Sequence, residues 1–98
     1  MKYTYEEIKK HDNINDSWII IDGEVFDVTN FMKHHTGGKM PAYFSGIDAT
    51  NIFEAVHPPH VRQILKSKSF RDKYYKGTVK NYKNPNPKKC KKIIKCLD

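Results

Sequence analysis

An Asp-Gly pair between two runs of β-forming residues sets the strongest local constraint on the fold of this chain. Residues 18–21 (Trp-Ile-Ile-Ile) and residues 25–28 (Val-Phe-Asp-Val) flank Asp22-Gly23. Tight hairpin turns favour Asp or Asn followed by Gly, so the pattern predicts an antiparallel β-hairpin. We expect its strands to form the floor of the fold, and residues 74–79 to return to that floor as a last strand.

Short helix signals occur on both sides of the hairpin. Thr4 and Glu7 form a capping box, which predicts a helix running to about His11 with Tyr5, Ile8 and Tyr3 turned inward. Further helices are predicted from Thr29 or Asn30 to His35, within residues 41–45, from Asp48 or Thr50 to Val56, and from Pro59 through Leu65.

A chain of 98 residues has room for one domain, and a domain of this size buries only about two-thirds of its unfolded surface. The predicted elements indicate a small α+β domain over residues 1–80, with short helices forming a pocket over a small mixed sheet. Residues 81–98 are predicted to be a lysine-rich C-terminal tail. A planar apolar cofactor between the helices would add the buried surface that so short a chain lacks, and would stabilise the native state by binding to it.

The net charge of +7 suggests a nucleic-acid partner until it is divided along the chain. Residues 1–79 hold 11 Lys+Arg and 10 Asp+Glu, whereas residues 80–98 hold seven lysines and one aspartate. Because the basic charge belongs to the tail, nucleic acid becomes a minor hypothesis. We interpret the tail as a solvated terminus, with weak peripheral contact to anionic lipid and steering towards an acidic redox partner as the alternatives.

The cysteines and the hydropathy of the chain bear on its compartment. Cys90 and Cys96 form no Cys-x-x-Cys-His motif, so covalent haem attachment is disfavoured and reduced thiols are expected. The sequence shows neither the apolar stretch of a signal peptide nor an uninterrupted apolar run of about 18 residues. We therefore expect a soluble, cytoplasmic protein without a transmembrane anchor.

Two histidines carry the functional signal. His35 precedes Gly37-Gly38, and His57 ends a helical pattern that Pro58-Pro59 terminates. Phe31 and Phe53 each lie one helical turn before one of these histidines. Such a pair would suit several metals, but two imidazoles between apolar side chains fill both axial positions of a haem iron, which can then only pass electrons.

The candidate residues for the cofactor pocket are apolar side chains and two glycines, at which the backbone could approach the cofactor closely. Each apolar residue is equally compatible with an ordinary position in the hydrophobic core. The candidates are Phe31, Gly37, Gly38, Tyr43, Phe44, Ile52, Phe53, Val56, Ile64 and Leu65. Each histidine needs an acceptor for its other ring nitrogen, and backbone carbonyls near the Gly37-Gly38 and Pro58-Pro59 turns are the candidates.

The chain resembles the cytochrome b5 family over roughly residues 3–79. The resemblance rests, in order, on Trp18, residues 25–31, His35-Thr36-Gly37-Gly38, Gly46-Ile47-Asp48-Ala49-Thr50 and Phe53-Glu54-Ala55-Val56-His57-Pro58. It implies a non-enzymatic haem b protein with His35 and His57 as axial ligands. Such a protein relays single electrons from a flavin-containing reductase to an acceptor such as an oxidase, desaturase or hydroxylase.

The sequence departs from the family pattern at several positions. Thr36 stands where proline is usual, and Pro58 where many members have a serine that anchors a haem propionate. The segment 39–45 is basic where many relatives carry glutamates. Asp48 and Glu54 are the clearly retained acidic residues of the rim that members of the family use for docking.

Three alternatives stay open beside the electron carrier. His60 could replace His57 as the ligand or join His34 in a zinc site, although prolines between His57 and His60 spoil helical spacing. The same scaffold could also serve as a haem- or sterol-binding regulatory module. A purely structural domain is the third alternative.

Overall fold

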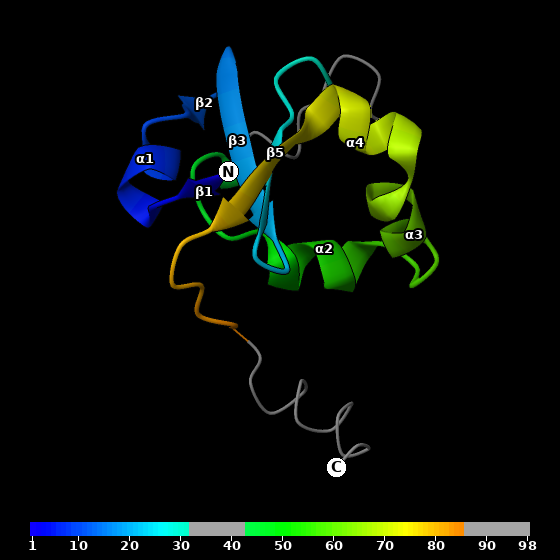
Figure 1. Cartoon of the computed structure of the whole chain (residues 1–98). Helices are drawn as coiled ribbons and strands as arrows, with labels where there is room; N and C mark the ends of the chain where they lie inside the picture. The colour runs from blue at the N-terminus through cyan, green and yellow to red at the C-terminus, as the bar shows by residue number, and fades with distance from the viewer. Residues whose placement is uncertain (32–42, 86–98) are drawn as a thin grey trace.

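The computed structural model describes residues 1–31 and 43–85 (Figure 1). In chain order the described elements are β1 (Lys2–Tyr3), α1 (Tyr5–Lys9), β2 (Asp12–Asn13), β3 (Asp16–Ile21), β4 (Glu24–Asp27), α2 (Thr50–Val56), α3 (Val61–Lys66), α4 (Lys68–Tyr74) and β5 (Tyr75–Val79). The five described strands form one sheet in the order β1-β5-β4-β3-β2, in which only the β1–β5 pair is parallel. This mixed sheet with short helices confirms the predicted α+β class.

The predicted hairpin is present. Strands β3 and β4 pair from Trp18↔Asp27 to Ile21↔Glu24, which leaves Asp22 and Gly23 as the two turn residues. Their φ angles are 54° and 82°. A turn with φ > 0 at both central residues matches the twist of the strands it joins, which is why Asp-Gly was a sound signal.

Alternation along β3 divides the core between the two faces of the sheet. Ile19 and Ile21 face a cluster with residues of α2 and α3, whereas Trp18 and Ile20 face a cluster with Ile8 of α1. In Figure 1, α1 accordingly lies on one side of the sheet and α2, α3 and α4 on the other. The second side carries the candidate site.

The first predicted helix is shorter than expected. The capping box is present, with Thr4 N–H donating to Glu7 Oε1 at 2.8 Å and Glu7 N–H donating to Thr4 Oγ1 at 3.1 Å. Helix α1 ends at Lys9 rather than near His11. Ile8 is fully buried and Tyr3 packs partly buried, as predicted, but Tyr5 is 37% exposed, so its predicted inward orientation is wrong.

Helices α2 and α3 are present around His57 as predicted, but the N-cap residue of α2 is Ala49 rather than Asp48 or Thr50. Helix α2 begins at Thr50, whose N–H donates to Asp48 Oδ1 at 2.9 Å, and ends at Val56, just before Pro58. Helix α3 begins at Val61, shortly after the predicted start at Pro59. The helix predicted from Thr29 or Asn30 to His35 lies largely outside the described residues, as does most of the one within residues 41–45.

Three elements were not predicted. Helix α4 begins after Ser67, whose Oγ accepts a hydrogen bond from Phe70 N–H. Strand β1 pairs with β5 from the other end of the chain, and β2 is a two-residue extension beside β3. Helix α4 matters most for the site because its Phe70 and Tyr74 pack against the same cluster as α2 and α3.

Candidate functional site

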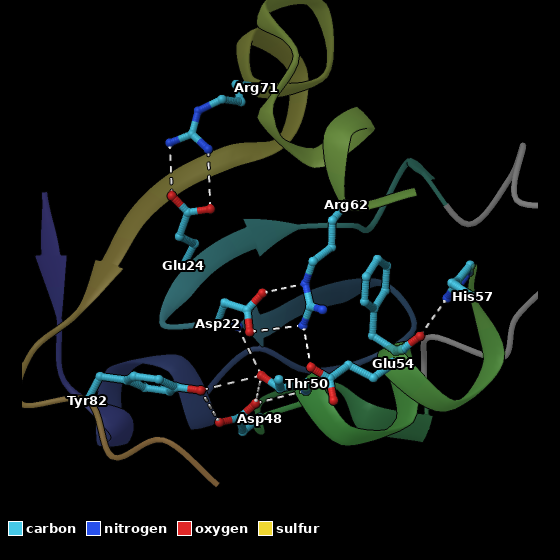
Figure 2. Close-up of polar contacts among 10 residues, drawn as sticks. Asp22, Glu24, Asp48, Thr50, Glu54, His57, Arg62, Arg71 and Tyr82 are labelled. Carbon is cyan, nitrogen blue, oxygen red and sulfur yellow. Dashed lines mark hydrogen bonds and ion pairs between the residues drawn. The ribbon is translucent and has the colours of Figure 1, made fainter. Parts of the chain in front are cut away.

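His57 lies at the C-terminal end of α2, where the helix stops and the backbone becomes extended. Its backbone N–H donates to the carbonyl oxygen of Phe53 at 3.1 Å, and its ring Nδ1 lies 3.2 Å from that same oxygen. The two rings also stack, with centroids 4.6 Å apart and planes 29° apart. Figure 2 shows the Nδ1 contact at the end of α2.

This contact has a chemical consequence for the imidazole. A carbonyl oxygen can only accept, so the ring that bonds it carries its proton on Nδ1. The Nδ1–H tautomer leaves the lone pair on Nε2, which is the arrangement that metal-ligating histidines use. The acceptor expected near the Pro58-Pro59 turn is thus found one helical turn earlier, at Phe53.

The other half of the predicted ligand pair lies outside the described residues. That half comprises His35, Gly37 and Gly38. Their pairing with His57 stays a prediction.

The structure brings most of the described pocket candidates together. Phe53 and Leu65 are buried in one cluster with residues of the sheet, and Phe31, Phe44 and Ile52 pack partly buried against it. Tyr43 is 78% exposed and lies outside this cluster.

Two apolar pocket candidates, one on each of the two helices that flank His57 in the chain, are exposed. Val56 of α2 is 56% exposed and Ile64 of α3 is 50% exposed. Apolar side chains gain by leaving water, so an apolar group bound beside His57 would cover surface that now costs free energy. The exposed apolar side chains and the basic Nε2 together fit a haem.

Two aromatic residues of α4 that pack against the site, Phe70 and Tyr74, were not among the predicted pocket residues. Phe31 lies edge-on to Phe70 and Tyr74 of α4, with ring centroids 5.7 Å and 5.3 Å apart. Phe70 and Tyr74 are themselves 4.7 Å apart. Their four-residue spacing after Ser67 was the available signal, because residues four apart share a helix face.

Arg62 of α3 joins three elements around the site (Figure 2). Its Nε donates to Asp22 Oδ2 at 2.7 Å and one Nη donates to Asp22 Oδ1 at 3.1 Å. The same Nη donates to Glu54 Oε2 of α2 at 2.8 Å. Burial lowers the pKa of Arg62, but the hydrogen bonds and charges of Glu54 and Asp22 outweigh it and raise that pKa above its ordinary value.

A second polar cluster ties the start of α2 to the segment after β5. Tyr82 Oη donates to Asp48 Oδ2 at 3.0 Å, and Thr50 Oγ1 donates to Asp48 Oδ1 at 2.5 Å. Thr50 Oγ1 also accepts from Asp22 N–H at 2.9 Å. Burial and the neighbouring Asp48 raise the pKa of Tyr82 to about 12, against a lowering effect of Thr50. Both acidic residues of the expected docking rim, Asp48 and Glu54, are therefore engaged by neighbours within the molecule.

Three observations bear on the zinc-site hypothesis and on whether a described helix could span a membrane. His60 is exposed, and His34 lies outside the described residues. Among residues 1–31 and 43–85, no three His, Cys, Asp or Glu side chains are grouped as a metal site would need. The described helices include none with the length and apolar character to cross a membrane.

Residues 4–80 match the protein family described as "Cytochrome b5-like Heme/Steroid binding domain". The solved structure of a cytochrome b5 of Ostreococcus tauri virus 2 superposes with a TM-score of 0.69 at 37% identity, over 80% of this chain and 95% of that one. Acyl-lipid (8-3)-desaturase B of Dictyostelium discoideum is 39% identical over 84 residues, which are 85% of this chain and 17% of that protein. Inducible nitrate reductase (NADH) 2 of Glycine max is 40% identical over 65 residues, which are 65% of this chain and 7% of that protein. The chain thus spans less than a fifth of the length of these two enzymes.

Proposed function

The chain belongs to the cytochrome b5 family, and from this premise we propose that it is a haem b electron carrier with His35 and His57 as the two axial ligands. The observation that carries the proposal is the contact between His57 Nδ1 and the carbonyl oxygen of Phe53 at 3.2 Å. A histidine held in this way directs a basic Nε2 away from its own helix. This is the condition that an iron ligand must meet.

Each described residue of the site has a role in this proposal. Phe53 stacks on the imidazole and holds its plane, while Val56 of α2 and Ile64 of α3 present exposed apolar surface. A haem in this slot would supply reversible one-electron chemistry at an iron whose axial positions are both filled. His35 completes the ligand set. No general acid, base or nucleophile is needed, so we propose a carrier and not an enzyme.

The partners follow from the same premise. A flavin-containing reductase would supply single electrons, and an acceptor enzyme would consume them. The relatives named as a desaturase and a nitrate reductase support an oxidoreductase acceptor, because in each the matching segment is a small part of a much longer protein. A location in the cytoplasm is part of the same proposal.

A visible spectrum of the purified protein titrated with haem tests the proposal. We expect a sharp Soret band and narrow, split α and β bands after reduction with dithionite, and no change on adding carbon monoxide. His35→Ala and His57→Ala should each abolish the low-spin spectrum. His60→Ala is the matched control, because it removes an exposed histidine three residues from His57.

Three results would contradict the proposal. Ready binding of carbon monoxide would show that the iron has an open position. Loss of the low-spin spectrum in His60→Ala but not in His57→Ala would move the ligand to His60. If haem does not bind and a sterol does, the steroid-binding alternative in the family's description takes its place.

A further inference from the structure

The turn that carries His57 is closed by an ion pair between its two ends. Glu54 lies in α2, three residues before His57, and Arg62 lies in the first turn of α3, five residues after it. Their side chains meet at 2.8 Å. The segment between them includes Pro58 and Pro59, which donate no backbone N–H to secondary structure. The backbone of this segment is held by the N–H groups of Val61 and Arg62, which donate to the carbonyls of Pro58 and Pro59 at 3.1 and 3.2 Å, and the Glu54–Arg62 contact adds a direct link from α2 to α3.

The same guanidinium anchors this closed turn to the sheet. Arg62 binds Asp22 through two parallel hydrogen bonds, and Asp22 lies in the tight turn between β3 and β4. Bidentate contacts of this kind fix direction as well as distance. One side chain thus connects α2, α3 and the hairpin turn (Figure 2).

Arg62 also contacts the residue that holds the imidazole. Its guanidinium carbon lies 5.7 Å from the centroid of the Phe53 ring, within the range of a cation–π contact. Phe53 in turn stacks on His57 and accepts its Nδ1 hydrogen bond. Arg62 is therefore connected to the imidazole of His57 through one intervening residue, Phe53.

We propose that Arg62 is the positioning residue for the ligand His57: by closing the 54–62 turn and anchoring it to the hairpin, it sets the orientation of the imidazole and slows the loss of haem. The role in haem retention rests on the proposed function. The orientation of the imidazole is a property of the chain itself.

Arg71 provides a matched control. It also pairs with a carboxylate of the sheet, Glu24, at 3.2 Å (Figure 2). Its guanidinium carbon lies 3.7 Å from the ring centroid of Tyr75. The exposed fractions of the two arginine side chains are 30% for Arg62 and 28% for Arg71. Arg71 extends from α4 and does not border the His57 turn. Each of the substitutions Arg62→Gln and Arg71→Gln removes a two-point contact with one carboxylate and a contact with an aromatic ring. Arg62→Gln also removes the contact with Glu54 at the His57 turn.

The experiment measures haem transfer from each holoprotein to excess apomyoglobin, together with the free energy of unfolding in urea. Arg62→Gln should speed haem loss by about 10- to 100-fold, the usual cost of removing a group that orients a metal ligand. Arg71→Gln should cost similar stability but leave the rate of haem loss near that of the parent protein. Equal acceleration in both variants would overturn the proposal, because it would mean that general stability controls haem loss.

Nitrogen-15 NMR of the haem-free protein gives a readout that does not need haem. Arg62→Gln should reduce the population of the Nδ1–H tautomer of His57, and Arg71→Gln should not. Glu54→Gln is a milder variant that opens the turn but keeps the Asp22 contact, and it should follow Arg62→Gln in direction. If no haem binds to the parent protein, the proposed function fails, and an unchanged tautomer in Arg62→Gln then overturns the positioning role as well.

Discussion

The hydroxyl of Tyr82 donates a hydrogen bond to Oδ2 of Asp48 at 3.0 Å, and the Tyr82 ring packs over Gly23. This contact joins the segment after β5 to the loop before α2 and to the turn of the β3–β4 hairpin. Tyr82 lies just beyond residue 80, where the sequence suggested that the domain ends. The folded contacts therefore continue past the last strand.

The contact predicts how stability depends on alkaline pH. The pKa of Tyr82 is about 12 in the folded state against 10.0 ordinarily, so the unfolded chain loses this proton first as pH rises. The stabilisation is complete below pH 10 and is lost as pH rises towards 12. Tyr82→Phe should remove this component and cost about 1 kcal/mol of unfolding free energy at neutral pH.

Urea titrations of both proteins across that pH range check this prediction. Because lysines also titrate there, the quantity to follow is the difference in unfolding free energy between the parent and Tyr82→Phe. The difference should shrink as pH rises. A constant difference would mean that Tyr82 contributes packing alone.

Gly23→Ala should destabilise the protein for two separable reasons. Its φ of +82° is strained for any L side chain, and a Cβ atom at this position would lie 2.9 Å from Cδ2 of Tyr82. Together these effects should cost about 1–3 kcal/mol of unfolding free energy. Repeating the substitution in a Tyr82→Ala background separates them, since only the backbone strain then remains. If the two costs are the same, the ring does not crowd this position.

The sequence could predict those parts of the fold that interactions between adjacent residues determine. The Asp22-Gly23 turn and the Thr4 cap follow from the conformations and hydrogen bonds of a few adjacent residues. The pairing of β1 with β5 joins Lys2 to Thr78, and no pattern within either segment specifies the other. Such pairings depend on the whole chain collapsing.

In the candidate site, too, features set by adjacent residues could be predicted, whereas contacts between distant residues could not. The position of His57 at a helix end follows from Pro58, but its hydrogen bond to Phe53 requires the helix to be built. The contact of Arg62 with Asp22 spans 40 residues and depends on how α3 packs. Tyr82 falls within the predicted lysine-rich tail, and no local pattern in the sequence indicates its ring contact with Gly23.

Ser67 caps the start of α4, a helix that was not predicted, and its removal should weaken that helix. Its Oγ accepts from Phe70 N–H at 3.4 Å and donates to the carbonyl of Ile64 at 2.7 Å, so one hydroxyl ends α3 and starts α4. Ser67→Ala should cost about 1 kcal/mol of unfolding free energy. Ser69→Ala, an exposed position inside α4, should be neutral or slightly stabilising because alanine is the better helix former. Thermal unfolding measures both, and equal effects would count against the cap.

A substitution at Ile64 should change haem affinity without changing the stability of the haem-free protein, because this apolar side chain is exposed. Ile64 is 50% exposed, so Ile64→Thr should change the unfolding free energy of the haem-free protein by no more than about 0.5 kcal/mol. If haem covers this side chain, the same change places a hydroxyl against an apolar group and removes a buried methyl. We expect haem affinity to fall roughly tenfold.

Ile47→Thr is the matched control for that experiment. Ile47 is 47% exposed and lies before α2, outside the predicted pocket. Both substitutions exchange one β-branched side chain for another, so they differ mainly in what a bound haem would cover. Titrating each apoprotein with haem, and unfolding each in urea, gives the two quantities. A fall in affinity confined to Ile64→Thr would place α3 at the haem, whereas equal affinities would remove Ile64 from the pocket.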